Sequence, residues 1–439
     1  MNGRRCGAAA DAPATHDRGP RIAVVISLLL AAFLVVAPAA QTGRGLGPTY
    51  AGVEASANWV GTWMAAQQLV EPGNLPPAPG FTDTTLRQIV RVSMGGRTLR
   101  VRFSNEFGRA PLTLLAAAIA RAGGGSAIDP ATDRALTFAG RTAATIPEGT
   151  VLLSDPIAFE LPALSTLAVT IHVRGAPPDV TGHPGSRTTS YLQAGRAVSA
   201  PGLPDAVPVD HWYFLGGVDV GAPPTAGAVV ILGDSITDGR GSTTNGNDRW
   251  PDVLARRMQA SPATAGIAVL NAGIGGNRLL RDGLGPNALA RLDRDVLAQA
   301  GVGWLIVLEG INDIGTAAGA RAKGEPAATA DDVIGAYGQI IERARARGIR
   351  VYGATIMPFE GFSYAGYFTP ESEADRQRVN AWIRTSGRFD AVIDFDAIAR
   401  DPDRPSRLSA AVDGGDYLHP SAAGYRIMGE AVDLKLFVR

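Results

Sequence analysis

The sequence predicts a two-part chain, in which a β-sandwich or jelly-roll-like domain precedes an α/β domain with a parallel sheet. Three observations lead to this prediction. Residues 56–220 contain runs in which apolar and polar side chains alternate, which is typical of strands with one buried face. Residues 228–439 contain short apolar runs separated by helical stretches, the pattern of a sheet covered by helices on both faces. A Gly- and Pro-containing segment at 221–227 divides the two patterns and predicts a short linker.

The composition is that of a globular protein. The chain has 439 residues, of which 46% are hydrophobic and 19% charged, enough to bury the cores of two domains. Its 41 basic and 41 acidic residues cancel, so the charge gives no reason to expect a nucleic acid partner.

Residues 1–39 are predicted to be a signal peptide. Arginines precede an apolar run from Ile22 to Val36, and Ala37-Pro38-Ala39 has the small-residue pattern of a cleavage site. The run is shorter than the roughly 20 apolar residues of a membrane span, although the long basic start also fits an uncleaved anchor. We therefore expect a secreted or otherwise extracytoplasmic protein, with a membrane partner only if the signal is retained. Cys6, the only cysteine, would leave with the signal, so no cysteine chemistry is expected.

Within 56–220 the clearest strands are Leu99–Phe103 and Leu167–Val173, where every second residue is apolar. The run Leu86–Ser93 precedes the first of them, and Gly95-Gly96 between the two predicts the turn of a β-hairpin. Gly and Pro clusters recur at turn-like intervals, and no long amphipathic helix is evident. Two packed sheets, as in a sandwich or a jelly roll, are the expected arrangement.

Beyond residue 227, apolar runs of strand length alternate with helical stretches. The expected strands are Ala228–Leu232, Ile267–Asn271, Trp304–Leu308, Val351–Ile356 and Ala391–Phe395. The expected helices are Trp250–Ala260, Asn287–Ala300, Asp331–Arg347, Glu371–Gly387 and a last one from about Ser421. This alternation predicts a flavodoxin-like, three-layer domain with a doubly wound parallel sheet. The Ala/Gly-rich stretch 317–324 is expected to be a loop beside that sheet.

Polar motifs follow the first three predicted strands of this sheet. They are Gly233–Ser235, Gly273–Asn277 and Glu309–Asp313, and active residues of α/β proteins collect at such strand ends. A fourth motif, Asp416–His419, precedes the last helix and can reach the same edge, and no other histidine follows His211. A serine nucleophile needs an imidazole base, and the imidazole needs a carboxylate to fix its tautomer. The four motifs together predict a serine hydrolase.

These motifs resemble the sequence blocks of the SGNH (GDSL-like) hydrolases, in the same order and at similar spacing. The matching residues are Gly233-Asp234-Ser235, Gly276, Gly310-x-Asn312-Asp313 and Asp416-x-x-His419. The resemblance covers roughly 228–439. The stretches Gly233–Arg240 and Asn247–Pro251, and a β domain around Trp59–Asn105, are similar to a secreted bacterial acylhydrolase/arylesterase subfamily associated with xylan degradation.

The resemblance implies a role for each matching residue. Ser235 would be the nucleophile, His419 its general base and acid, and Asp416 the carboxylate that orients His419. The backbone N–H groups of Ser235 and Gly276 and the side-chain amide of Asn312 would form the oxyanion hole. A glycine suits its position because the backbone can then approach the substrate closely. This chemistry requires no cofactor.

Some roles have alternatives that the residues leave open. The Gly-Asp-Ser motif could merely cap a helix, and Asn312 and Asp313 could cap another, so Asp313 is left out of the catalytic set. Gly273 or Gly275 could be the oxyanion donor in place of Gly276.

The carboxylate partner of His419 also has a rival, Asp413. The three-residue spacing between Asp416 and His419 lets the carboxylate fold back to the imidazole, which favours Asp416. The other histidines are scattered and have no Asp, Glu or Cys partner at metal-ligand spacing, so no metal is expected; they are His16, His172, His183 and His211.

The resemblance implies a secreted carboxylic ester hydrolase that works through an acyl-enzyme. We expect small acyl esters as substrates, in particular acetyl groups on polysaccharide. The alternatives are a lipid or aryl esterase of lysophospholipase type, and an acyltransferase. A glycan-binding protein without activity is disfavoured, because no residue of the predicted site is lost. Trp59, Trp63 and Trp212 could stack on a sugar, but we expect them to pack in the core.

Overall fold

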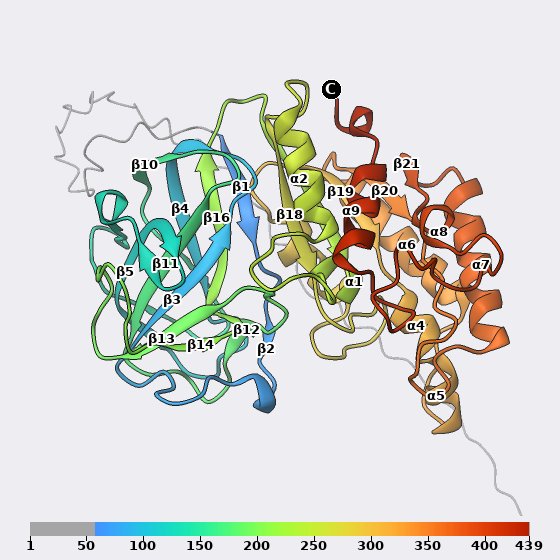
Figure 1. Ribbon diagram of the computed structural model, residues 1–439, viewed down its shortest axis with the longest axis horizontal. Helices are drawn as coiled ribbons and strands as arrows, with labels where there is room; N and C mark the ends of the chain where they lie inside the picture. The colour runs from blue at the N-terminus through green and yellow to red at the C-terminus, as the bar shows by residue number, and fades with distance from the viewer. Residues whose placement is uncertain (1–57, 439) are drawn as a thin grey trace, which may run out of the picture. The chain divides into compact units, whose positions relative to one another are not determined.

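The computed structural model describes residues 58–438, in which a strand-rich part is followed by a part of alternating strands and helices (Figure 1). The predicted signal peptide 1–39, with Cys6 and His16, lies outside the described residues. No helix within 58–438 is long and apolar enough to cross a membrane.

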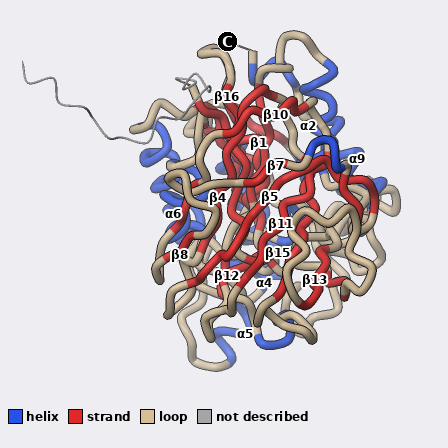
Figure 2. The backbone as a smooth tube through the Cα atoms, turned by 90° about the vertical axis from the view of Figure 1, so that its left-hand side faces the viewer, coloured by secondary structure: helices blue, strands red, loops and turns tan. Residues whose placement is uncertain are grey.

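The first part, which we call the β region (residues 59–221), is built from antiparallel strands that run side by side in Figure 2. Its longer strands are β1 (Trp59–Met64), β3 (Thr84–Arg91), β4 (Gly96–Ser104), β5 (Leu112–Gly124), β10 (Ile157–Leu161), β11 (Thr166–Val173), β13 (Ser190–Ala194) and β16 (Leu215–Gly221). One sheet contains the order β1-β16-β4-β10, and another contains β13-β3-β11-β5. A small third sheet consists of β2 (Gln68–Leu69), β12 (Thr181–His183) and β15 (Trp212–Tyr213). The prediction of a β-rich region is confirmed, while its jelly-roll connectivity stays a prediction.

The prediction of a β-hairpin at Gly95-Gly96 was wrong. Strand β4 pairs with β16 and β10, whereas β3 pairs with β11 and β13, so the two strands lie in different sheets. Two-residue hairpin turns need positive φ angles, and neither glycine has one. A Cβ on Gly95 would lie 2.4 Å from the carbonyl oxygen of Leu161. This glycine therefore allows a close approach of two backbones where the chain passes from one sheet to the other.

Strand β11 also differs from its expected half-buried state. Its alternate polar residues are buried as well as its apolar ones, and Thr170 is only 2% exposed. The second face is covered by the segment around residues 198–200. Arg87 of the neighbouring strand holds this segment by donating to the carbonyl oxygens of Val198 (3.2 Å) and Ala200 (2.8 Å).

The second part contains a sheet of five parallel strands in the order β18-β17-β19-β20-β21. The strands are β17 (Gly227–Gly233), β18 (Ile267–Gly273), β19 (Val302–Leu308), β20 (Arg350–Ala354) and β21 (Ala391–Ile393). The principal helices are α2 (Trp250–Ala260), α3 (Ala288–Leu292), α6 (Ala330–Arg345), α7 (Pro370–Thr385), α8 (Phe395–Ala399) and α9 (Ala422–Ala431). The predicted α/β class is confirmed.

The strand order explains where the helices lie. The connection from β17 to β18 runs in one direction along the sheet, and every later connection runs in the other. Because such crossovers are right-handed, α2 falls on one face and α3, α6 and α7 fall on the opposite face. The contacts agree, since α2 packs against α9, and α6 packs against α3 and α7. The direction reverses between β17 and β19, which is where open α/β sheets bind their ligands.

The Ala/Gly-rich stretch at 317–324 is mostly helical, as α5 (Ala317–Ala322), and the expectation of a loop was wrong. Alanine has the highest helix propensity of all residues, and the stretch contains only one internal glycine, Gly319, before the end of the helix.

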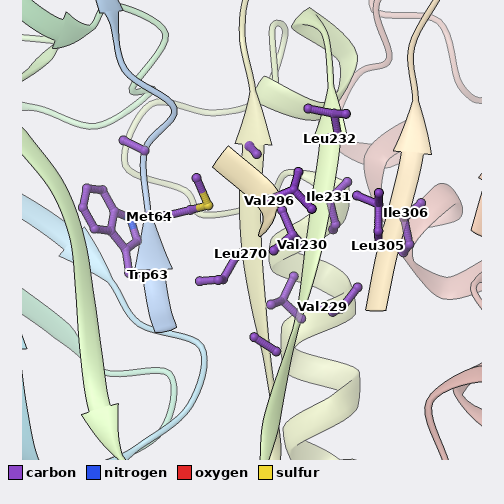
Figure 3. Packing of buried hydrophobic residues seen from close by; sticks show 14 of the residues in the cluster. Trp63, Met64, Val229, Val230, Ile231, Leu232, Leu270, Val296, Leu305 and Ile306 are labelled. Atoms are coloured by element: carbon purple, nitrogen blue, oxygen red, sulfur yellow. The ribbon is translucent and has the colours of Figure 1, made fainter. Parts of the chain in front are cut away.

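The β region and the α/β part share one hydrophobic core. In Figure 3, Met64 of β1 points toward Leu270 on β18. The backbone N–H of Gly61 donates to the carbonyl oxygen of Ala300 at 2.9 Å, and that of Val269 donates to the hydroxyl of Ser93 at 3.0 Å. The linker expected at 221–227 runs from the last residue of β16 to the first of β17, between parts that are packed together.

The tryptophans of the β region contribute to this core. Trp63 and Trp212 are 8% and 2% exposed and pack edge to face, with their ring centroids 4.9 Å apart. Neither presents a face to a sugar, and the expectation of core packing is confirmed for both. Trp59 is half-buried beneath the guanidinium of Arg100, which lies 4.5 Å from its ring centroid.

Candidate active site

Ser235 lies at the carboxyl end of β17, as the first residue of the short helix α1 (Ser235–Asp238). Asp234 caps this helix, and its Oδ1 accepts a hydrogen bond from the N–H two residues further on at 2.9 Å. Gly233 has to be a glycine, because a Cβ there would lie 2.1 Å from the hydroxyl of Thr237. The capping alternative therefore holds for Asp234, and it fixes the backbone that presents Ser235.

The imidazole of His419 lies between Ser235 and Asp416. The Ser235 hydroxyl lies 2.9 Å from Nε2 of His419, and Nδ1 of His419 lies 2.7 Å from Oδ2 of Asp416. The other oxygen of Asp416 accepts the backbone N–H groups of Leu418 (3.0 Å) and His419 (2.8 Å). Burial opposes ionisation of Asp416, but these hydrogen bonds outweigh it and hold its pKa below the ordinary value. An ionised Asp416 can only accept, so Nδ1 carries the proton and Nε2 is left to accept the proton of Ser235.

Asp413, the rival carboxylate, has a different task. Its Oδ1 accepts the backbone N–H groups of Gly415 and Tyr417, each at 2.9 Å. It therefore stabilises the loop that carries Asp416, and it is Asp416 that contacts the imidazole.

Asn312 lies in the helix α4 (Ile311–Gly315), directly after β19. Its Nδ2 donates to the carbonyl oxygen of Asn277 at 2.9 Å, and its Oδ1 accepts from the hydroxyl of Tyr367 at 2.8 Å. A carbonyl oxygen can only accept, so the amide orientation is fixed and the second N–H of Nδ2 is left for a ligand. The helix is capped by Gly310, so the expectation that Asn312 or Asp313 caps it was wrong.

The three candidate glycines differ in position. A Cβ on Gly273 would lie 2.3 Å from the backbone nitrogen of Asp238, so Gly273 is packed against α1. Gly275 and Gly276 both line the same pocket as Ser235. Gly276 has a φ of +66°, a conformation that other residues adopt only with strain.

A pocket of about 470 Å³ brings together Ser235, Gly276, Asn312 and His419. One wall of this pocket comes from the β region, which no sequence pattern indicated. The residues of that wall are Gln68, Glu71, Asn74, Pro184, Gly185, Arg187 and His211.

His183 connects the β region to the helix that carries Ser235. Its Nε2 lies 2.8 Å from Oδ1 of Asp238 in α1, and its Nδ1 lies 2.8 Å from the carbonyl oxygen of Ala66. Both side chains of the pair are almost fully buried. Because the carbonyl of Ala66 only accepts, Nδ1 is protonated and a further proton lies between Nε2 and Asp238. No sequence pattern indicated this pair, since its partners are separated by 55 positions.

A buried arginine, Arg291 of α3, joins the ends of three adjacent strands, β18, β17 and β19. It donates to the carbonyl oxygen of Gly233 at the end of β17 (3.0 Å) and to that of Ala272 in β18 (2.6 Å). It also pairs with Glu309, just past β19 (3.4 Å), and with Asp295 (3.1 Å). Five N–H groups on one planar side chain suit this task, which no sequence motif indicated.

Three carboxyl groups are crowded beneath the pocket floor. Burial raises the pKa of Asp234 to about 7, and the neighbouring charge of Asp313 raises it further. Burial likewise raises the pKa of Asp313 to about 6, against the effect of hydrogen bonds from the N–H groups of Leu279 and Leu280. Glu309 has a pKa well above its ordinary value, because of burial and the nearby Asp234. Burial therefore favours the protonated, neutral form of these three carboxyl groups. Arg291 is the principal cation beside them.

Among residues 58–438, no three His, Cys, Asp or Glu side chains lie close enough together to hold a metal ion. His172 pairs with the carboxylate of Asp83 at 2.8 Å, which is a single acidic partner rather than a ligand set.

Solved structures similar to the chain include three esterases or lipases. A GDSL-like lipase from Bacteroides thetaiotaomicron is 20% identical over 48% of this chain and 87% of that one, with a TM-score of 0.35. A catalytic mutant of an acetylxylan esterase from Geobacillus stearothermophilus is 22% identical over 47% and 91%, with a TM-score of 0.36. The acetyl xylan esterase AlAXEase is 19% identical over 46% and 96%, with a TM-score of 0.35.

None of the curated proteins compared with the chain matches it. The model of the GDSL-like lipase/acylhydrolase family matches residues 231–427, a range that includes every residue of the predicted site. The family resemblance of the sequence motifs is thereby confirmed. Residues 231–427 form a domain of the GDSL-like lipase/acylhydrolase family, and the protein that carries it is an ester-hydrolysing enzyme.

Proposed function

We propose that the protein is a serine esterase in which Ser235, His419 and Asp416 form the catalytic triad. The observation that carries this proposal is the continuous chain of hydrogen bonds from Ser235 Oγ through the imidazole to Asp416, with distances of 2.9 and 2.7 Å. Its order matches the roles of nucleophile, base and orienting carboxylate.

In the first half-reaction, Ser235 Oγ attacks the ester carbonyl carbon while His419 Nε2 takes the hydroxyl proton. The tetrahedral oxyanion is stabilised by the N–H groups of Ser235 and Gly276 and by the free amide N–H of Asn312. His419 then gives its proton to the departing alcohol, which leaves an acyl-enzyme. A water molecule, deprotonated by His419, repeats these steps and releases the carboxylic acid.

We further propose that the substrate is a short acyl ester of a polar alcohol, such as an acetylated carbohydrate. The wall formed by the β region supports this, because Gln68, Glu71, Asn74, Arg187 and His211 offer hydrogen-bonding groups where the alcohol could lie. Apolar side chains of the pocket, Leu284 beside Gly276 and Phe362 and Leu418 beside His419, suit an acyl group. The sequence resemblance to the xylan-associated subfamily supports the same substrate class. The basic and apolar N-terminal segment supports a site of action outside the cytoplasm.

The test measures release of acetate from acetylated xylan, and of 4-nitrophenol from acetyl to decanoyl esters, by wild type and Ser235→Ala. We expect wild type to prefer acetyl esters and the variant to lose at least about 10³-fold in kcat. Full activity of the variant would contradict the triad. A preference for long acyl chains would instead favour a lipid esterase.

A further inference from the structure

We propose that the pocket binds esters that carry a carboxylate, as acidic saccharides do, and that Arg187 is the residue that selects them. This inference rests on the proposed esterase function and names the substrate class of the same pocket. It starts from the charged side chains that line the pocket.

The acidic side chains that line the pocket are Glu71 and Asp238, and their hydrogen-bond partners are amide groups and a histidine. Both oxygens of Glu71 accept hydrogen bonds, one from Gln68 at 2.7 Å and one from Asn74 at 2.8 Å. Oδ1 of Asp238 is paired with His183 at 2.8 Å, while its Oδ2 has no hydrogen-bond partner among residues 58–438, and the residue is 2% exposed. Neither carboxylate is paired with an arginine of the pocket.

The arginines that line the pocket are Arg187, on the wall from the β region, and Arg240, just after α1, and within 58–438 neither has such a partner. In the described part of the chain, neither guanidinium makes an ion pair within 4.0 Å or donates a side-chain hydrogen bond that would occupy it. The Nε of Arg187 is buried and faces no acceptor. By contrast, the buried Arg87 and Arg291 each donate several hydrogen bonds. A buried donor without an acceptor is unfavourable, and a bound anion would supply the missing acceptor.

The backbone of Arg187 is held in a strained conformation. Its φ is +52°, in the left-handed region that side chains other than glycine seldom adopt. Hydrogen bonds to the neighbouring segment maintain this conformation. The N–H of Asn245 donates to the carbonyl oxygen of Arg187 at 2.9 Å, and Arg249 donates to that of Ser186 at 3.2 Å. Strained residues whose surroundings maintain the strain are found preferentially at active sites and ligand-binding sites.

The chemistry of the guanidinium defines the ligand class. It is always charged, and its planar set of donors matches the two oxygens of a carboxylate. A neutral sugar hydroxyl would leave the charge uncompensated. The carboxylate could belong to the alcohol half of the ester, as in a uronic acid, or to the acyl half, as in a succinyl group, and the experiment separates the two.

The test compares kcat/KM for matched pairs of esters. The first pair is acetylated methyl glucuronoside and its neutral glucuronamide, and the second is the 4-nitrophenyl esters of succinic and butyric acid. We expect wild type to prefer the charged member of one pair by roughly 10-fold or more, the effect of one charged hydrogen bond. Preference in the first pair places the anion on the alcohol side, and preference in the second places it on the acyl side.

Variants then connect the preference to Arg187. Arg187→Gln is expected to bring the charged-to-neutral ratio close to one, while Arg187→Lys keeps part of it. Arg141→Gln, at an exposed arginine outside the pocket lining, is expected to leave the ratio unchanged. The same ratio in wild type and Arg187→Gln, or no preference in either pair, would overturn the proposal. Hydrolysis of the neutral esters, tested with Ser235→Ala, reports separately on the esterase function.

Discussion

At the scale of single residues, Asn312 shows how a neutral side chain can be prepared for one event in catalysis. Its amide is held from both sides, by the carbonyl oxygen of Asn277 and by the hydroxyl of Tyr367. No reorientation is then needed when negative charge develops on the substrate. Preorganised donors of this kind stabilise the transition state more than the bound substrate.

We predict that Asn312→Ala lowers kcat by about 10²- to 10³-fold and changes KM little, because the lost hydrogen bond forms mainly in the transition state. Steady-state kinetics on a short acyl ester would measure this. Tyr367→Phe removes only the orienting hydrogen bond and should cause a smaller loss in kcat. An unchanged kcat with a raised KM in Asn312→Ala would mean that Asn312 serves substrate binding instead.

Asp313 makes the stability of the fold depend on pH. Its pKa is about 6 in the folded protein, because of burial, and about 3.9 in an unfolded chain. Between these values the folded state holds a proton that the unfolded state releases, so the free energy of unfolding falls as the pH rises. Asp234 acts in the same direction. The lowered pKa of Asp416 acts only below about pH 4, outside this window.

We therefore predict that wild type loses free energy of unfolding between pH 5 and pH 8, and that Asp313→Asn reduces this loss by on the order of 1 kcal/mol. Urea denaturation of both proteins at the two pH values measures the difference. A stability that rises over this range in wild type would show that the buried carboxyl groups are ionised throughout.

At the scale of elements, the strand ends and α3 act as one unit through Arg291. The strands β17, β18 and β19 each end in a loop that carries part of the predicted site, and Arg291 contacts residues at all three ends. Without Arg291, the ionised Asp295 would keep only Arg294 as a cationic partner, and the buried Oδ1 of Asn277 would have no donor.

We predict that Arg291→Leu lowers the free energy of unfolding by about 3–5 kcal/mol, because Asp295 loses one of its two cationic partners and buried acceptors lose their donor. Arg388 offers a matched control, because it pairs with Glu342 at the surface. Arg388→Leu should change stability by less than about 1 kcal/mol. Urea denaturation would compare the two variants, using the midpoints if the dependence of the unfolding free energy on urea concentration is the same. Equal effects of the two substitutions would refute the special role of Arg291.

At the scale of the whole described chain, the β region and the α/β part depend on each other. They share one core, and the buried pair of His183 and Asp238 crosses between them next to Ser235. The β region also supplies a wall of the pocket. A separable binding module would share neither its core nor its buried polar groups with its neighbour.

We predict that residues 58–438 unfold in one cooperative transition, because a shared core cannot be opened on one side alone. Hydrogen exchange in rising urea, followed by mass spectrometry on peptides from β11 and from β19, would give two midpoints. Coincident midpoints are expected. Opening of β11 at a clearly lower urea concentration would mean that the β region folds independently.

The sequence by itself determined the class of the α/β part and the family of its domain. Those features are local: a buried parallel strand is a short apolar run, and the residues of the predicted site follow directly after such runs. Asp416 and His419 could be paired from the sequence because they are three positions apart. The prediction that β3 and β4 pair was wrong, because a pair of glycines indicates a turn but not the sheet that each strand joins.

Only the tertiary structure decided how the β region takes part in the site. Arg187, His183 and Glu71 are far in sequence from Ser235, yet they line the pocket or contact the helix at its floor. Arg291 likewise gave no motif, since its partners are carbonyl groups that any residue could supply. Contacts of this kind depend on which surfaces pack against each other in the folded chain. Local sequence patterns do not contain that information.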